Sequence, residues 1–196
     1  MIFYGAGGHA KVVIEAWMSS GGKVTAIYDD DLSIRTILGR TVSGAYNGDA
    51  FPGSNLTITV GNNNIRKKLA GRVTNPFGTV IHSSAIISHS AKIGVGTVAM
   101  ARSVVQAEST VGNHVILNTS CNVDHDCYID DFVHIAPGAI LCGDVRVGEG
   151  TLIGAGATIL PGVSIGKWAI VGAGSVVVSN VPDSVTVFGV PSRMVK

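Results

Sequence analysis

The chain has 196 residues, of which 46% are hydrophobic and 14% are charged, and its formal net charge is +1. This length and composition allow a sizeable core and one or two soluble domains. The charge balance leaves no basic surplus for a nucleic acid, and the run Arg66-Lys67-Lys68 is most simply a solvated helix face. A polyanion-binding role is therefore disfavoured.

The first part of the chain, residues 1–76, is expected to alternate strands and helices. Short apolar segments have strand character, and segments with apolar residues at helical spacing follow two of them. The strands are expected at 2–4, 24–28 and 56–60, and the helices at 11–19 and 65–72. This order predicts a small α/β Rossmann-like domain, half of a doubly wound fold.

The turn from Gly5 to Ala10 matches the pattern G-x-G-x-x-A, and acids follow about twenty residues later at Asp29 and Asp30. This is the dinucleotide fingerprint, so NAD is an open alternative. A dinucleotide needs two mononucleotide halves, however, and only one fits before residue 76. Because glycines let a backbone approach phosphate and a helix N-terminus favours anions, the turn indicates a site for one nucleoside diphosphate.

From Ile81 to Val177 the chain repeats with a period of six. A small or aliphatic residue occupies every sixth position: Ile81, Ile87, Ile93, Ala99, Val105, Val111, Leu117, Val123, Ile129, Ile135, Leu141, Val147, Ile153, Ile159, Ile165, Val171 and Val177. A small or β-branched residue follows four positions later. Neither a helix nor a flat strand has this period, which fits a chain that runs a short strand and turns a corner. Three such sides make a coil of about eighteen residues, so about five coils are expected.

The tandem motif [Leu/Ile/Val]-Gly-x-x-[small]-x resembles the left-handed parallel β-helix of the hexapeptide-repeat acyltransferases. The resemblance implies a homotrimer that binds acyl-coenzyme A in the grooves between subunits. The predicted fold is therefore a Rossmann-like domain over 1–76, then a left-handed parallel β-helix of about five coils over 77–196, with a short C-terminal extension.

Four further segments, Tyr4–Val13, Val60–Lys68, Val123–Cys127 and Phe188–Arg193, resemble the subfamily of nucleotide-4-amino-sugar N-acetyltransferases and sialic-acid-type O-acetyltransferases. Its members bind the nucleotide sugar with the N-terminal domain. The resemblance implies substrate-binding roles for Gly5, Gly7, Gly8, His9, Asp29, Asp30, Asn62 and Asn118. It implies acetyl-CoA-binding roles for His134, Gly143, Ala155, Gly172, Val190 and Pro191, with no metal.

His125 is the expected general base. It lies two residues after inward Val123, so it should occupy a corner facing solvent or a neighbouring subunit, between Asp124 and Asp126. A neighbouring carboxylate fixes the imidazole tautomer and makes it a better base near neutral pH. A lone His is more often an ordinary surface residue, but the resemblance to the family's His-acid pair favours the base. The other histidines without a carboxylate neighbour, His82, His89 and His114, are read as surface residues.

Two more positions complete the expected site. Gly143 follows His125 by eighteen residues and should stack on it, where its N–H could bind the thioester oxygen as charge develops. The alternative is a turn glycine needed for a positive φ angle. His134 is half a coil from His125 and should lie on another side of the prism. If both serve one site, they must come from different chains of a trimer.

The leading prediction is transfer of acetyl from acetyl-CoA to the 4-amino group of a nucleotide-linked 4-amino-4,6-dideoxy sugar, for surface glycan synthesis. O-acetylation of a sugar hydroxyl and a non-catalytic nucleotide-sugar-binding scaffold remain alternatives, and UDP, dTDP and GDP are not distinguished. Segment 151–166 lacks charge but is broken by glycines and a proline, which argues against a membrane span. No signal peptide is evident, and the three cysteines suit a reducing compartment, so we expect a cytoplasmic protein.

Overall fold

A computed structural model describes residues 1–195 and begins with a small parallel sheet of order β2-β1-β5. Its strands are β1 (Ile2–Tyr4), β2 (Ala26–Tyr28) and β5 (Leu56–Ile58). The helices are α1 (Gly8–Ser19) and α2 (Asn63–Ala70), and a two-stranded ribbon, β3 (Thr36–Ile37) with β4 (Arg40–Thr41), and a 3-10 turn, η1 (Gly48–Ala50), lie between them. The predicted Rossmann-like α/β domain is confirmed.

Both helices begin earlier than the sequence predicts. Gly7 is the extended N-cap of α1 and offers no side-chain cap, so Gly8, His9 and Ala10 are helical rather than part of the turn. Helix α2 starts at Asn63 because the side chain of Asn62 accepts a hydrogen bond from the amide of Ile65 at 3.0 Å. Both changes place residues of the glycine and asparagine motifs in the first turn of a helix.

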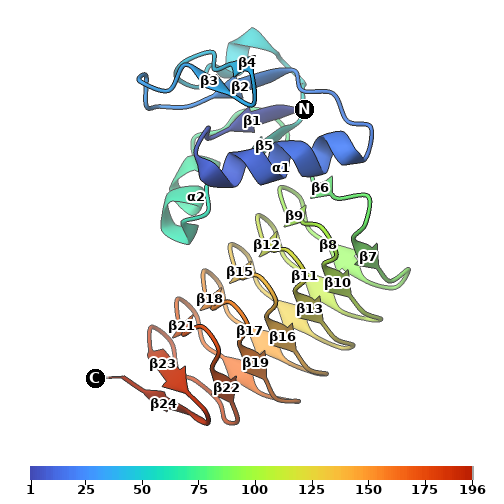
Figure 1. The fold of residues 1–196 in the computed structure, drawn as a ribbon, viewed down its shortest axis with the longest axis vertical. Helices are drawn as coiled ribbons and strands as arrows, with labels where there is room; N and C mark the ends of the chain where they lie inside the picture. Colours follow the sequence, from blue (N-terminus) through green and yellow to red (C-terminus); the bar gives the residue numbers. More distant parts are fainter. Residues whose placement is uncertain (196) are drawn as a thin grey trace.

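The rest of the chain is a three-sided parallel β-helix (Figure 1). The first sheet holds β6 (Val80–Ile81), β9 (Val98–Ala99), β12 (Ile116–Leu117), β15 (His134–Ile135), β18 (Leu152–Ile153), β21 (Ile170–Val171), β23 (Thr186–Gly189) and β24 (Ser192–Met194). The second holds β7 (Ile86–Ile87), β10 (Val104–Val105), β13 (Asn122–Val123), β16 (Ile140–Leu141), β19 (Thr158–Ile159) and β22 (Val176–Val177). The third holds β8 (Lys92–Ile93), β11 (Thr110–Val111), β14 (Tyr128–Ile129), β17 (Arg146–Val147) and β20 (Ser164–Ile165).

Each strand pairs in parallel with the strand one coil further on, so that Val105 pairs with Val123 and Val123 with Leu141. The coil therefore advances eighteen residues per turn, as the six-residue period predicts. There are about six turns rather than about five, because β21, β22 and a bridge from Ile165 to Val181 continue the spiral beyond the last full coil.

The core of the β-helix consists of the two inward positions of each hexad. Val123, Ile135 and Leu141 are fully buried, and so are Cys121 and Ala139 at the small positions. Ile81 is an exception and remains 38% exposed, because it belongs to the first coil and has a coil above it on one side only. The repeat thus fills the interior of the β-helix with alternating bulky and small side chains.

The N-terminal domain docks on the outside of the first coils. Val13 and Ile14 of α1 share one buried cluster with outward-facing Val80, Val98 and Ile116 of the first sheet. Figure 1 shows α1 between the small sheet and the first coils, with α2 beside the same face. The two parts of the chain therefore share an apolar interface.

This docking overturns two sequence predictions. His114 is not a surface residue: it is 5% exposed, stacks on Phe132 at a ring-centroid distance of 5.0 Å and meets Phe77 edge-on at 4.3 Å. Arg66 is not part of a solvated face either, because it is 1% exposed, whereas Lys67 and Lys68 are exposed. In both cases the contact between the N-terminal domain and the β-helix buries a side chain that either part alone would leave open to water.

Candidate active site

The His125 corner lies in the turn between β13 and β14. The Nδ1 atom of His125 is 2.7 Å from Oδ2 of Asp126, and the amide of His125 donates to Asp124. Both His125 and Asp126 are well exposed, with side chains 61% and 59% accessible. Asp126 has a left-handed backbone (φ 60°), as does the corresponding residue of neighbouring coils. Because an ionised carboxylate can only accept, Nδ1 carries the proton and Nε2 keeps a free lone pair.

Hydrogen bonding to Asp126, followed by the charge of Asp124, raises the pKa of His125 above its usual value. His125 is therefore more basic than a free imidazole, and its side chain is exposed.

Gly143 lies against the His125 ring, one coil further on. A Cβ atom at Gly143 would come 2.6 Å from Cε1 and 2.7 Å from Nε2 of His125. Gly143 is absent from the glycines with positive φ, and the left-handed residue of this turn is Asp144 (φ 54°). The alternative that Gly143 is needed for its backbone angle is therefore wrong. A glycine is needed because the imidazole occupies the space of a side chain.

The amide of Gly143 donates to no acceptor among residues 1–195, although its carbonyl accepts from Gly162 at 3.0 Å. At the same corner the amide of His125 is satisfied by Asp124. Gly143, which is buried and whose N–H has no acceptor within residues 1–195, thus packs against the accessible imidazole of His125.

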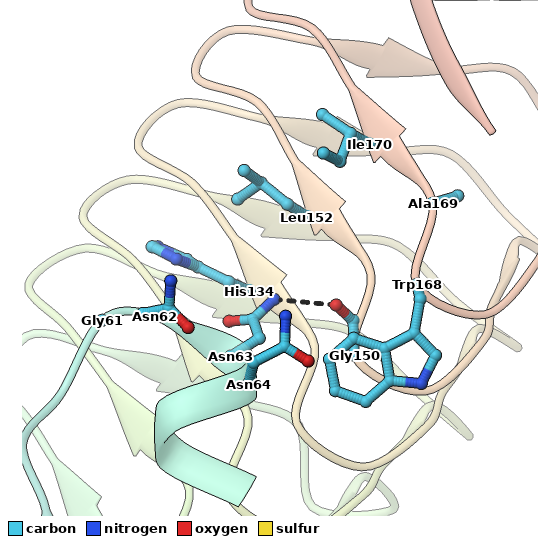
Figure 2. Close-up of a pocket in the computed structure, with 10 residues that line it drawn as sticks. All are labelled: Gly61, Asn62, Asn63, Asn64, His134, Gly150, Leu152, Trp168, Ala169 and Ile170. Carbon is cyan, nitrogen blue, oxygen red and sulfur yellow. Dashed lines mark hydrogen bonds between the residues drawn. The ribbon is translucent and has the colours of Figure 1, made fainter. Parts of the chain in front are cut away.

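A cavity of about 200 Å³ lies between α2 and the outer face of the first sheet. Figure 2 shows the asparagines of the α2 N-terminus on one side and His134 with two apolar strand residues on the other. Its lining is Gly61, Asn62, Asn63, Asn64, His134, Gly150, Leu152, Trp168, Ala169 and Ile170. Asn63 closes one edge by donating to the carbonyl of Gly150 at 3.0 Å. The cavity has polar groups at one end and an apolar wall along the coils.

His134 is held as a neutral imidazole beside this cavity. Asn118 uses its Oδ1 to accept from the amide of Thr119, so its Nδ2 must donate to Nε2 of His134 at 3.0 Å. Burial, reinforced by the charge of Arg66, lowers the pKa of His134 to about 4. Asn118 and His134, assigned to different ligands by the sequence, are therefore direct neighbours.

The glycine turn opens α1 next to the same region. Gly7 and Gly8 have open space where a side chain would lie, whereas Gly5 has φ 116° and is packed against Val60 and Thr59. His9 is half-buried, its ring centroid is 6.4 Å from that of His134, and its Nε2 has no hydrogen-bond partner among the described residues. Burial lowers the pKa of His9 to about 4. The turn thus has open space at Gly7 and Gly8 and a nitrogen on His9 that the described residues leave unpaired, and Gly5 shapes the turn.

The two acids after β2 are engaged within the domain. Asp29 accepts from the amide of Ala6 at 2.6 Å, which ties it to the glycine turn. Asp30 accepts from the hydroxyl of Tyr4 at 2.8 Å and from Arg72 at 3.0 Å. Asp30 remains partly exposed at 44%. Asp29 therefore positions the turn, and Asp30 links Tyr4 of β1 to Arg72.

The remaining residues that the sequence predicts to bind acetyl-CoA lie in the C-terminal coils. Ala155 is exposed in the turn after β18. Gly172 follows β21 and is covered by Phe188, whose ring leaves no room for a side chain there. Val190 is 71% exposed, and Pro191 is also exposed, in the turn between β23 and β24.

The predicted residues thus fall into separate groups within one chain. His125, Asp126 and Gly143 meet at the corner between the second and third sheets. His9, Asn62, Asn118 and His134 gather around the first sheet and the N-terminal domain, and Ala155 and Gly172 follow strands of that sheet. A single chain does not unite the groups.

Sequence reasoning missed Arg66, Asn63, Trp168 and the apolar wall of Leu152 and Ile170. For Arg66 a signal was present, because it lies three residues before Leu69 and hence on the buried face of α2. Trp168 carried a weaker signal: a large aromatic in a hexad turn, where it adopts φ 54°.

Comparisons with known proteins agree with this fold. Residues 1–73 match the PglD N-terminal domain family, and residues 144–179 match the bacterial transferase hexapeptide (six repeats) family. GDP-perosamine N-acetyltransferase from Caulobacter crescentus, solved with CoA and GDP-perosamine, is 39% identical with a TM-score of 0.96, covering 100% of this chain and 96% of that chain. The chain belongs to the hexapeptide-repeat sugar N-acetyltransferases. Its β-helix accordingly matches the left-handed fold of this family.

Two further members of the family are similar. The acetyltransferase domain of PglB from Neisseria gonorrhoeae, solved with acetyl coenzyme A, is 39% identical with a TM-score of 0.91, covering 99% of this chain and 98% of that chain. UDP-N-acetylbacillosamine N-acetyltransferase from Bacillus subtilis is 41% identical over 113 residues, 50% of this chain. The chain spans 49% of that curated relative. The predicted family and its acetyl-CoA co-substrate are confirmed at this level.

No helix within residues 1–195 is long and apolar enough to cross a membrane. In the same part of the chain, no group of three or more His, Cys, Asp or Glu side chains is arranged to hold a metal ion.

Proposed function

We propose that this protein transfers the acetyl group of acetyl-CoA to the 4-amino group of a nucleotide-linked 4-amino-4,6-dideoxy sugar. The observation that carries the proposal is the His125 corner, where a free imidazole nitrogen packs against Gly143, whose N–H has no acceptor within residues 1–195. Relatives whose names specify amino-sugar acetylation support the acceptor class.

The reaction needs no covalent enzyme intermediate. The neutral amine of the sugar attacks the acetyl carbonyl carbon, and the N–H of Gly143 stabilises the oxyanion of the tetrahedral intermediate. Nε2 of His125 takes a proton from the attacking nitrogen, and the carbon–sulfur bond breaks as the thiolate of coenzyme A leaves. Asp126 holds the ring through Nδ1 and offsets the positive charge that it gains.

The N-terminal domain supplies the acceptor site in this proposal. The open turn at Gly7 and Gly8 admits a phosphate near the α1 N-terminus, and the cavity bounded by Asn62 and His134 is adjacent. Acetyl-CoA would lie between two chains, with Gly143 of one chain and Ala155, Gly172 and the turn at Val190 and Pro191 of another, because a single chain places these residues at different corners. GDP-perosamine in the relative favours a nucleoside diphosphate sugar over a dinucleotide.

The experiment that tests this function is a mass-spectrometric screen with acetyl-CoA. The acceptors are nucleotide 4-amino-4,6-dideoxy sugars carrying UDP, dTDP or GDP, each with its 4-hydroxyl counterpart. We expect a mass gain of one acetyl group on amino acceptors. Acetylation of the hydroxyl compounds alone would instead support an O-acetyltransferase, and binding without transfer would support a scaffold.

We further propose a homotrimer in which His125 of one chain and His134 of another serve one site. The support is their separation: His125 lies at the corner between the second and third sheets, and His134 faces outward from the first. Light scattering should therefore give the mass of three chains.

Subunit mixing makes this prediction sharper. The variants His125→Ala and His134→Ala should each be impaired alone, while trimers reassembled from a one-to-one mixture should recover about a quarter of wild-type activity. That fraction is expected because one site in four would pair the two intact residues. Mixtures no more active than the separate variants would show that each site belongs to one chain.

The proposed reaction also suggests a role for the protein in the cell. Acetylated nucleotide sugars are donors for glycan assembly, which motivates a role in surface glycan synthesis. Cys121, Cys127 and Cys142 are free thiols, as a reducing compartment such as the cytoplasm would maintain.

A further inference from the structure

The outward side chains of the second sheet form an uncharged row that stays open to the surroundings. Each strand contributes its first residue: Ile86, Val104, Asn122, Ile140, Thr158 and Val176. Ile86 and Ile140 are 62% and 43% exposed, and the other four are half-buried. The corresponding row of the third sheet contains Lys92 and Arg146, and the lower part of the first sheet is covered by α1. The second sheet therefore presents a mainly apolar row along its whole length.

Asn122 carries the amide of this row. It pairs with Val104 in the coil before and with Ile140 in the coil after, so its side chain lies between two apolar neighbours. Its Oδ1 atom is buried and has no hydrogen-bond partner among residues 1–195. An enclosed amide oxygen without a partner is unfavourable because it has lost its hydrogen bonds to water. The amide thus needs a partner from outside the chain.

The divided active site indicates where that partner would come from. In the proposed homotrimer, the His125 corner of one chain adjoins the corner at Asn118 of the next. Asn118 precedes strand β13 and His125 follows it, so the second sheet spans the distance between these two corners. When one such contact repeats around a threefold axis, the ring closes with the second sheets facing the axis. The first sheets then face away from the axis, which leaves room for the N-terminal domain that docks on them.

We propose that the outer row of the second sheet packs against two further copies of this chain around a threefold axis, and that Asn122 selects this arrangement. Threefold symmetry sets the three Asn122 side chains at one height, so the N–H of each amide can donate to Oδ1 of the next. Chains shifted along the axis would set Asn122 against apolar neighbours and leave its amide unpaired. A single buried Asn selects chain number and register in coiled coils for the same reason. The proposal rests on the homotrimer proposed above and names the surface that builds it.

The first test uses the wild-type protein without substrate. Ile140 of the second sheet and Ile65 of α2 form a matched pair, because a single chain leaves them 43% and 50% exposed. In hydroxyl-radical labelling read by mass spectrometry, Ile140 should lose most of its labelling relative to Ile65, since the partner chains cover it. Equal labelling of the two isoleucines would contradict the proposal, whether or not any variant folds.

The second test places a charge in the row. Asn122→Asp keeps the size of the side chain but replaces the N–H donor with a carboxylate, so three like charges would meet at the axis. Association should weaken by about 100-fold or more, as measured by sedimentation across a dilution series at pH 8. The control, Thr110→Asp, adds a carboxylate at a half-buried outward position of the third sheet and should leave association unchanged.

The third test separates the amide from the apolar contact. Asn122→Leu replaces the amide with an apolar side chain of similar size, so the chains should still associate. Native mass spectrometry should then show other assemblies beside trimers, because no buried amide disfavours the shifted arrangements.

Three outcomes would overturn the proposal: equal labelling of Ile140 and Ile65, unchanged association of folded Asn122→Asp, or Asn122→Leu that forms trimers alone. If Asn122→Asp fails to fold, the wild-type labelling and Asn122→Leu decide. None of these readouts involves acetyl transfer, so a trimer inactive on every amino sugar would refute the proposed reaction and leave this surface standing. A trimer with an unprotected Ile140 would refute this surface alone, and a monomeric wild-type protein would refute both the homotrimer and the surface.

Discussion

Replacing His125 with alanine should lower kcat by about 10²- to 10⁴-fold, the usual range for the loss of a general base. The KM for either substrate should change little, because His125 is an exposed corner residue whose ring contacts Asp126 and Gly143 rather than the core. The measurement is steady-state acetyl transfer to the amino sugar identified by the screen.

The control for this variant is Asp126→Asn, which keeps the size of the side chain and removes its charge. It should lower kcat less than His125→Ala does, because it weakens the base without removing it. A kcat for His125→Ala within about threefold of wild type would show that positioning of an already deprotonated amine is sufficient, and the base assignment would be withdrawn.

The pH profile gives an independent check on the same group. A general base acts when deprotonated, so the rate should rise with pH through the pKa of His125. Hydrogen bonding to Asp126 raises that pKa, so the inflection should lie above the ordinary histidine value of 6.5. Asp126→Asn removes this cause and should move the inflection to lower pH. An inflection that stays in place would identify another titrating group, such as the acceptor amine.

Gly143→Ala should be the second most damaging substitution, lowering kcat by about 10²-fold. The new Cβ would come within 2.6 Å of the His125 ring, so the imidazole must move away from the attacking nitrogen. The backbone itself should tolerate alanine because φ of Gly143 is not positive. Stability should therefore change much less than rate, as thermal unfolding would report.

The matched control is Gly71→Ala, at the C-cap of α2. Gly71 likewise has no positive φ (φ −70°), and a Cβ there would meet only the carbonyl of Lys68 at an ordinary 3.7 Å. It should leave kcat unchanged. Wild-type activity in Gly143→Ala would mean that His125 does not use the ring position seen here, and the proposed pairing of base and oxyanion donor would fail.

The six-residue period determined the β-helix and the His125 corner because its rules are local. Each coil repeats the one before, so a residue's position in the period gives its face, and a spacing of eighteen gives its neighbour in the next coil. That is why the contact of Gly143 with His125 and the burial of Cys121 could be predicted from spacing. The same reasoning identified the strands, the helices and the glycine turn of the N-terminal domain, although with helix starts a few residues late.

Only the tertiary structure decided what lies outside the repeat. His114 and Arg66 are buried, and His134 faces a cavity, because α1 and α2 dock on the outer face of the first sheet. No local period encodes that contact: it depends on apolar residues such as Val13 and Val98, far apart in the chain, covering each other. Whether an outer face of the β-helix is exposed or buried depends on where the N-terminal domain docks. The sequence of the repeat alone does not specify that position.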